Sequence, residues 1–220
     1  MADLAIWVEK TLGHKPRDLA LFERALTHSS RGDNHYERLE FLGDRILGLT
    51  IASWLYEIFP AEPEGKLSRR LNALVSGETC AEIARELAIG GKAILGKQAR
   101  DDGAADSDNV LGDIVEALIG ALYLEAGLES AAGFIRRAWG DRVCIQDRAP
   151  KHPKSELQEW AAAHDKKPPQ YRMTGRHGPH HTPRFAVEVE IAGVGTAGAE
   201  GLSKQEAETA AAKALLEKLS

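Results

Sequence analysis

Apolar residues recur at intervals of three and four along the first two thirds of the chain, which is the spacing of amphipathic α-helices. The alternation of apolar and polar residues that indicates strands is absent from this part of the sequence. The pattern therefore predicts an all-α domain at residues 1–145. Glycines are expected to separate its helices, and they are Gly13, Gly65, Gly90 and Gly127.

The pattern changes after Pro150 and Pro153, and we interpret residues 146–153 as a linker because proline cannot continue a helix. Residues 185–191 then alternate with a period of two, as in a strand covered on one face. The remaining segments predict a small α+β domain, in the order α-β-β-β-α, at residues 154–220. Its expected elements are a helix at 155–163, strands at 170–174, 185–191 and 195–200, and a helix at 203–219 opened by a capping box of Ser203 and Glu206.

The segment from Glu37 to Arg45, Glu-Arg-Leu-Glu-Phe-Leu-Gly-Asp-Arg, places acids together on one helix. At about 100° per residue, Glu37, Glu40 and Asp44 share one narrow arc. Like charges at these spacings repel, so we expect a positive group beside them. The residues expected on the opposite, core side are Leu39, Leu42, Ile46 and Leu49.

A second acidic pair, Asp113 and Glu116, lies in an apolar run that predicts a buried helix. Buried carboxylates are unfavourable unless they are paired or bind a metal ion. We therefore expect the two acidic helices to pack together, with small residues at the contact, and to bind a divalent cation. All-oxygen ligands favour Mg²⁺, with Mn²⁺ as a substitute, over zinc. The predicted metal ligands are Glu40, Asp44, Asp113 and Glu116, and the predicted small contact residues are Gly48, Ala117 and Gly120.

The acids allow two other interpretations, of which the first stays open and the second fails. Acidic pairs at this spacing also occur on ordinary solvated helices. A di-iron bundle would require Glu-x-x-His, and no Glu in the chain has a His three residues later.

The segment from Glu37 to Arg45 resembles the signature of the ribonuclease III family, and the segment from Asp113 to Gly120 resembles the second acidic helix of that family. Two further pieces agree, namely Ala25-Leu26-Thr27-His28-Ser29 and Glu64-Gly65-Lys66-Leu67-Ser68. The C-terminal part resembles a double-stranded RNA-binding domain through residues 153–159, 178–181 and 201–207. The resemblance covers nearly the whole chain.

The resemblance implies a Mg²⁺-dependent endoribonuclease that hydrolyses double-stranded RNA and leaves 5′-phosphate and 3′-hydroxyl ends. It implies catalytic roles for Asp44 and Glu116, and supporting roles in the active site for Glu37 and Glu64. The expected substrates are ribosomal RNA precursors and structured transcripts. No small organic cofactor is expected.

A homodimer is expected because one chain has one set of four acids, whereas cutting both strands of a duplex takes two. Phe41 is the candidate interface residue, since it lies near the acidic arc and away from the core side of its helix. The alternative is that Phe41 lines a helix contact within one subunit.

In such RNA-binding domains the first helix and the first hairpin loop meet minor grooves, and the last helix begins over phosphates. The predicted RNA contacts are Ser155, Gln158, Glu159, His180, His181, Ser203 and Lys204. Alternatively, Ser155 and Gln158 only cap their own helix. A metal site at His177, His180 and His181 lacks further ligands at suitable spacing.

Three features depart from the family pattern and bear on RNA affinity. Arg45 stands where many relatives have Ser, and Gln205 stands at a place that is usually basic. The predicted polar loop at residues 101–109 is acidic where relatives often carry basic residues.

Charge alone does not indicate RNA, because the net charge is −5. Residues 1–150 carry 18 Lys and Arg against 24 Asp and Glu, a net of −6, and the rest carries 10 against 9, a net of +1. Cys80 and Cys144 are predicted to be buried and suggest no disulfide framework. Without a signal peptide or a membrane-spanning run, the expected location is the cytoplasm.

Two rival functions remain to be distinguished by experiment. A non-catalytic RNA-binding or ribosome-associated protein would leave the four acids without a purpose. An all-helical nucleotide pyrophosphohydrolase would use clustered acids with Mg²⁺ but would not need an RNA-binding domain.

Overall fold

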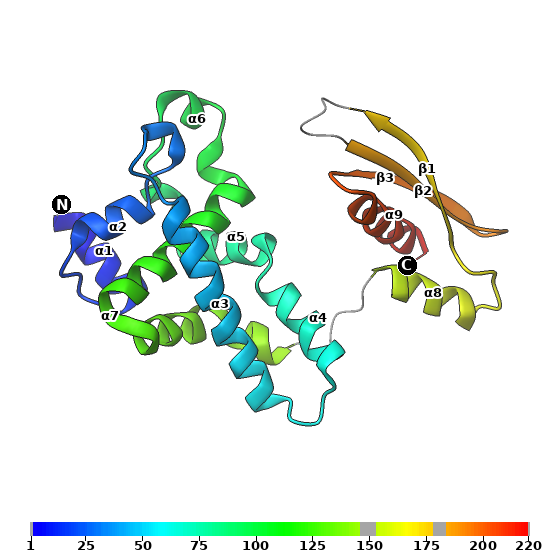
Figure 1. Ribbon diagram of the computed structural model, residues 1–220, viewed down its shortest axis with the longest axis horizontal. Coiled ribbons are helices and arrows are strands. Elements are labelled where there is room, and N and C mark those ends of the chain that lie inside the picture. The colour runs from blue at the N-terminus through cyan, green and yellow to red at the C-terminus, as the bar shows by residue number, and fades with distance from the viewer. Residues whose placement is uncertain (1, 146–152, 178–183, 220) are drawn as a thin grey trace. The chain divides into compact units, whose positions relative to one another are not determined.

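The computed structural model describes residues 2–145, 153–177 and 184–219, and it divides into two compact units, residues 1–150 and 151–220 (Figure 1). The predicted linker lies outside the described residues, except Pro153, which is the first residue of a helix. The predicted domain limits at residues 145 and 154 therefore stay a prediction. Among the described residues, no helix combines the length and the apolar character needed to cross a membrane.

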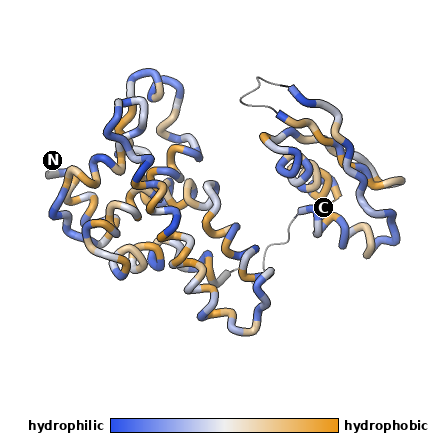
Figure 2. Tube along the Cα trace, viewed as in Figure 1, coloured by the Kyte–Doolittle hydropathy of each residue, from blue (hydrophilic) through white to orange (hydrophobic). Residues whose placement is uncertain are grey.

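The first unit is built from helices, as the periodicity predicted. The described helices are α1 (Ala2–Leu12), α2 (Leu19–Ala25), α3 (Glu37–Ile58), α4 (Glu64–Leu74), α5 (Gly77–Glu86), α6 (Lys97–Asp101) and α7 (Asp108–Ile145). Short 3-10 turns occupy Ser29–Arg31, Ile89–Lys92 and Ala104–Asp106. In Figure 2 the loop region around α6 is hydrophilic, whereas hydrophobic stretches follow the helices in the middle of the unit.

Helices α3 and α7 form the centre of this unit and contribute fully buried side chains to one core, among them Leu47, Ile51, Ile114 and Leu118 (Figure 1). Burying a side chain of this size contributes about 1.5–3 kcal/mol. The two acidic segments are therefore held side by side by apolar side chains of a shared core.

The two backbones approach most closely at a pair of glycines. A Cβ added to Gly43 would collide with the carbonyl oxygen of Glu116, and one added to Gly120 would collide with the carbonyl oxygen of Leu39. Gly120 was predicted at this contact. Gly48 was also predicted there, but a Cβ at Gly48 would meet nothing within 4 Å, so that prediction is wrong and Gly43 takes its place.

Helix α7 changes direction at Gly127, whose φ of 81° favours glycine. Just before the break, the Glu125 carboxylate accepts hydrogen bonds from the backbone N–H of Arg17 at 2.7 Å and of Asp18 at 3.1 Å, and lies 2.7 Å from His14 Nε2. The connection between α1 and α2 is thus tied to the break in α7. Gly127 separates helical segments as predicted.

Three smaller predictions need correction. Leu49 was placed in the core but is 56% exposed. Gly65 does not separate helices, because it lies in the first turn of α4. The predicted loop at residues 101–109 contains a 3-10 turn, and its last two residues already belong to α7. Cys80 is buried as predicted, whereas the side chain of Cys144 lies outside the described residues.

The second unit has the predicted α-β-β-β-α order. Its elements are α8 (Pro153–Ala163), β1 (Gln170–His177), β2 (Arg184–Ile191), β3 (Gly195–Gly201) and α9 (Lys204–Leu219). The strands form an antiparallel sheet in the order β1-β2-β3, in which Val189 pairs with Tyr171 on one side and with Ala197 on the other. Val187, Val189 and Ile191 are buried, as the alternation predicted.

The starts of the two helices differ in how their free N–H groups are satisfied. At α9 the Ser203 hydroxyl accepts from the Glu206 N–H at 3.1 Å, and the Glu206 carboxylate accepts from the Leu202 N–H at 2.8 Å, which confirms the predicted cap. Helix α8 begins at Pro153, where a missing N–H has no cost. Ser155 is therefore inside the helix, and its interpretation as a cap is wrong.

Candidate functional site

Five acids from α3 and α7 gather where the two helices meet. Burial raises the pKa of Glu116 to about 8, and the negative charges of Asp44, Glu40 and Asp113 add to this rise. Burial likewise raises the pKa of Glu40 to about 7, with contributions from Asp113, Glu37 and Asp44. Glu116 therefore lies within electrostatic reach of Glu40, Asp44 and Asp113, so the structure brings the four predicted acids into one neighbourhood.

The expected positive group is supplied only in part by the chain. Arg45 Nη1 lies 3.0 Å from Asp44 Oδ2, but the Arg45 side chain is 70% exposed, so solvent weakens the pair. Arg45 lowers the pKa of Glu116 less than any of the acids raises it. The cluster thus keeps an excess of negative charge.

Tyr36 fixes one of these acids from the buried side. Its side chain is buried, and its hydroxyl donates a hydrogen bond to Asp113 Oδ2 at 3.1 Å. Burial and the neighbouring acids raise the Tyr36 pKa above its ordinary value, so the hydroxyl remains a donor. The sequence analysis missed this residue, although it directly precedes the acidic segment.

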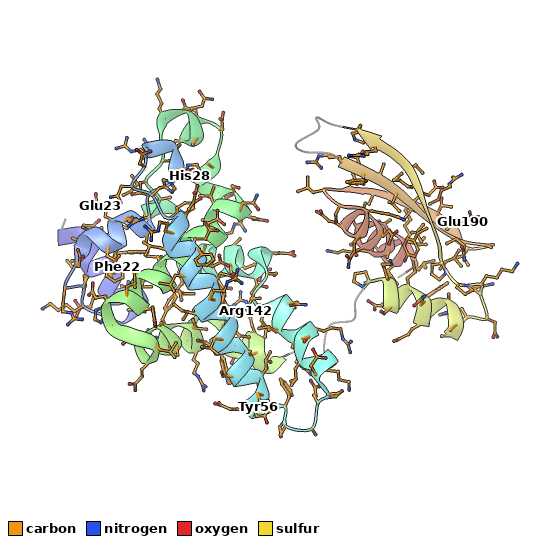
Figure 3. All side chains as sticks on the ribbon, viewed as in Figure 1. Phe22, Glu23, His28, Tyr56, Arg142 and Glu190 are labelled. Carbon is orange, nitrogen blue, oxygen red and sulfur yellow. The ribbon has the colours of Figure 1, made fainter. Side chains whose placement is uncertain are left out.

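His28 lies against the same tyrosine. The two rings meet edge to face with centroids 5.8 Å apart, and the charge of His28 lowers the pKa of Asp113, although burial leaves that pKa raised overall. Figure 3 shows His28 beside the start of α3, whereas Tyr56 is at the other end of that helix. Tyr36 therefore holds the Asp113 carboxylate, and His28 packs against the ring of Tyr36.

The donor set fits a hard divalent cation. As they stand, no three His, Cys, Asp or Glu side chains of the described residues converge closely enough to hold a metal ion. The half-buried carboxylates with raised pKa values nevertheless form a site that a bound cation would stabilise. The cation would displace the protons of the carboxyl groups and offset the repulsion between the carboxylates. Oxygen donors of this kind suit Mg²⁺ or Mn²⁺.

The supporting acids differ in position. Glu37 is exposed at the rim, where its charge raises the pKa of Glu40. Glu64, the first residue of α4, accepts a hydrogen bond from Ser68 Oγ at 2.7 Å, and it is not among the groups that shift the pKa values of Glu40, Asp113 and Glu116. The structure therefore joins Glu37 to the cluster and does not join Glu64.

Phe41 points away from its own subunit. Its side chain is 66% exposed, and the nearby Arg45 guanidinium lies 5.6 Å from the ring centroid. The alternative that Phe41 lines a helix contact within one subunit is therefore wrong.

In the second unit, the first two turns of α8 and of α9 line a common groove with a volume of about 690 Å³. The lining residues are Lys154, Ser155, Gln158, Lys204, Gln205 and Glu208. The groove brings together three predicted RNA contacts from two helices: Ser155, Gln158 and Lys204. Lys154, Gln205 and Glu208 were not predicted, although Lys154 and Gln205 directly adjoin residues that were.

Two other predicted RNA contacts, Glu159 and Ser203, are not among the residues that line this groove. Glu159 is exposed on α8, and the hydroxyl of Ser203 is engaged by its own helix. His180 and His181 lie outside the described residues. His177 Nε2 lies 3.2 Å from Glu200 Oε1, so this histidine has a carboxylate neighbour in the sheet.

Comparisons with known proteins match both units. A family model described as Ribonuclease-III-like matches residues 18–141, and the model of the double-stranded RNA binding motif matches residues 153–219. The chain is 64% identical over 211 residues to Ribonuclease 3 of Zymomonas mobilis, covering 96% of this chain and 86% of that protein. It is also similar to the crystal structure of the nuclease domain of ribonuclease III from Campylobacter jejuni, with a TM-score of 0.60 and 35% identity over 62% of this chain and 94% of that one.

A second structure of that Campylobacter jejuni domain, described as showing structural flexibility in a region involved in dimer formation, matches with a TM-score of 0.59. Its identity to this chain is 34%, and the match covers 66% of this chain and 98% of that one.

Proposed function

This chain belongs to the ribonuclease III family, and we propose that its four clustered carboxylates hold a divalent cation with which it hydrolyses phosphodiester bonds in double-stranded RNA. The observation that carries the proposal is the contact of α3 and α7, where burial and then the neighbouring acids raise the pKa values of Glu40 and Glu116. A cluster of this kind lacks a purpose in a protein that only binds RNA.

In this proposal Glu40, Asp44, Asp113 and Glu116 bind the ion, with Asp44 and Glu116 closest to the reaction. Bound Mg²⁺, or Mn²⁺ in its place, would supply an activated water and neutralise charge on the attacked phosphate. The water oxygen bonds to phosphorus, the P–O3′ bond breaks, and a proton goes to the departing O3′. The products then carry 5′-phosphate and 3′-hydroxyl ends.

The other residues bind and orient. Tyr36 holds the Asp113 carboxylate through the hydrogen bond described above. Glu37 shapes the rim of the site, and Glu64 acts from α4 on RNA near it. The groove of the second unit binds the duplex through Ser155, Gln158 and Lys204, with Glu159, Ser203, His180 and His181 as further contacts.

We also propose a homodimer in which Phe41 meets the partner subunit. Phe41, Leu49 and Tyr56 are 66%, 56% and 73% exposed, and at about 100° per residue they share one side of α3. A two-fold axis along this side would present two equivalent sites to the two strands. We place the enzyme in the cytoplasm, with ribosomal RNA precursors and structured transcripts as substrates.

One assay tests the reaction and its rivals. Labelled double-stranded RNA, double-stranded DNA and free nucleotides are each offered with Mg²⁺ or with a chelator. Cleavage of double-stranded RNA that stops with the chelator supports the proposal. Binding without cleavage indicates a non-catalytic protein, and hydrolysis of nucleotides alone indicates a pyrophosphohydrolase.

A second assay tests the dimer. Wild-type protein is mixed with excess Glu116→Gln subunits and left to exchange. Mixed dimers should nick one strand, so native gels should shift from double-strand breaks to nicked duplex. Unchanged double-strand cutting per wild-type subunit, or a fully active monomer in solution, contradicts the dimer.

A further inference from the structure

A carboxylate lies among the lysines of the groove in the second unit. Glu208 Oε2 is 2.6 Å from Lys154 Nζ, and Glu208 Oε1 is 3.8 Å from Lys204 Nζ. Glu208 is 16% exposed, whereas Lys204 is 65% exposed. The same residues line the place where a phosphate of the duplex is proposed to bind.

Both lysines stand where a helix already carries partial positive charge. Lys154 is the second residue of α8, and Lys204 is the first residue of α9. Cations are unfavourable at helix N-termini, and anions are favourable there. Glu208 therefore occupies the electrostatic role that a phosphate would otherwise take.

Tyr171 adds a second observation on the same carboxylate. Its hydroxyl oxygen is buried and has no hydrogen-bond partner among the described residues, and its ring centroid lies 4.9 Å from Lys154 Nζ. Burial, together with the negative charge of Glu208, raises the pKa of Tyr171 to about 12. Lys154 Nζ thus neighbours both the Tyr171 ring and Glu208, and a buried hydroxyl donor without a partner is unfavourable.

We propose that Glu208 is an internal competitor of the RNA phosphate. In the free domain Glu208 holds Lys154 and Lys204, and once RNA binds these lysines Glu208 accepts a hydrogen bond from the Tyr171 hydroxyl. The proposal rests on the proposed binding of double-stranded RNA in this groove. Glu208 is a positioning residue here, because it acts on RNA through the two lysines.

The competitor role predicts the direction in which RNA affinity changes when Glu208 is altered. RNA must break the Lys154–Glu208 pair before its phosphate can use Lys154, so part of the binding free energy is lost. Removing the charge of Glu208 should strengthen binding about two- to fivefold, the worth of a partly exposed ion pair. The affinity should also fall more steeply with salt, by up to about 0.9 in the logarithmic slope for each lysine released. A purely structural role of Glu208 predicts weaker binding instead.

The test measures binding of a fluorescent RNA duplex by anisotropy over a range of salt, with full-length protein and chelator to prevent cutting. Glu208→Gln keeps the shape of the side chain and removes its charge. Glu217→Gln is the matched control, because Glu217 is exposed on the same helix, outside the groove, and its loss changes the net charge equally. We expect tighter binding and a steeper salt slope for Glu208→Gln only. Binding equal to or weaker than that of the control overturns the proposal.

Tyr171→Phe tests the second part of the proposal, in which Glu208 exchanges the lysines for the Tyr171 hydroxyl. Because the hydroxyl has no hydrogen-bond partner within the described part of the domain, its loss should leave the melting temperature unchanged or raised, while RNA binding weakens. A lower melting temperature with unchanged RNA binding contradicts the exchange. This variant also serves if Glu208→Gln does not fold.

Lys204→Met separates this inference from the function on which it rests. If wild-type protein does not bind the duplex, or if Lys204→Met binds it as well as wild-type does, the proposed RNA groove is wrong. If wild-type binds and Lys204→Met binds more weakly, but Glu208→Gln gives no gain, only the competitor role is wrong.

Discussion

The acidic site between α3 and α7 and the groove between α8 and α9 both lie where two helices meet, but they treat charge in opposite ways. The acidic site brings carboxylates together, and burial raises the pKa values of Glu40 and Glu116. The second pairs two lysines with Glu208 at distances of 2.6 and 3.8 Å. A site of the first kind gains stability when a cation arrives, whereas one of the second kind must release its own counterion before it binds.

The largest expected effect is on cleavage, which a change in the acidic site should abolish while RNA binding by the groove is kept. Glu116→Gln removes a proposed metal ligand, which should cost several kcal/mol of transition-state stabilisation, about 10³-fold or more in rate. RNA affinity should stay within about twofold, because the groove is untouched. Cleavage and gel-shift assays on one duplex measure both quantities.

Glu129→Gln is the matched control, since Glu129 is exposed on α7 beyond its break. It should cut at the wild-type rate. Substantial residual cleavage by Glu116→Gln would remove that acid from the proposed site.

The next prediction concerns the backbone contact that the acidic site has and the groove lacks. Gly43→Ala places a Cβ against the carbonyl of Glu116, so the helices must separate, at an expected cost of about 1–3 kcal/mol of unfolding free energy. Thermal unfolding should therefore occur at a lower temperature.

Gly48→Ala provides the contrast on the same helix. Its Cβ meets nothing within 4 Å, and alanine is favoured over glycine inside a helix by about 0.5–1 kcal/mol. The melting temperature should rise or stay constant. Equal losses in both variants would show that Gly43 is not a special contact.

A smaller effect is expected when a supporting hydrogen bond is removed from the acidic site. Tyr36→Phe leaves Asp113 without its donor, and a hydrogen bond to a charged group is worth about 1.5–3 kcal/mol. The Mg²⁺ concentration for half-maximal cleavage should rise on the order of tenfold, the lower end of that range. Calorimetric titration of Mg²⁺ gives a second readout that does not depend on activity.

Tyr56→Phe is the control, because Tyr56 lies at the far end of α3 and the variant keeps the aromatic ring that the proposed dimer surface would use. It should leave the Mg²⁺ dependence unchanged. If Tyr36→Phe behaves in the same way, Tyr36 does not hold Asp113 for metal binding.

The contrast between the regions also explains which features could be predicted. Periodicity sufficed for the helices, the sheet and the acidic arc, because these depend on neighbours within a few residues along the chain. It did not predict that Gly43 rather than Gly48 lies at the helix contact, or that Leu49 is exposed. Those features depend on the crossing angle of α3 and α7, which follows from the whole core.

Long-range partners were missed for a related reason. Tyr36 and Asp113 are 77 residues apart, and Lys154 and Glu208 are 54 apart. Local spacing reveals Glu208 only as a helical neighbour of Lys204, four residues earlier. Its closer partner belongs to another helix, and a single sequence does not indicate that pairing.

The smallest expected effect is on the pH dependence of the melting temperature, which should come from the acidic site and not from the groove. The pKa values of Glu116 and Glu40 are raised from 4.5 to about 8 and about 7 in the folded protein. Raised pKa values mean that these acids contribute stability below about pH 4.5, and that this contribution is lost as the pH rises through 7 and 8. Metal-free protein should therefore melt at a lower temperature at pH 8.5 than at pH 6, and Mg²⁺ should raise the melting temperature more at pH 8.5.

Glu116→Gln sharpens this test, because a neutral side chain cannot titrate. The difference in melting temperature between wild-type and Glu116→Gln should move in favour of the variant as the pH rises from 6 to 8.5. Glu208→Gln should show no such trend, since Glu208 already has lysine partners 2.6 and 3.8 Å away. Parallel curves for wild-type and Glu116→Gln would mean that the acids of α3 and α7 do not repel one another in the folded protein, and the case for a cation between them would then lose its electrostatic basis.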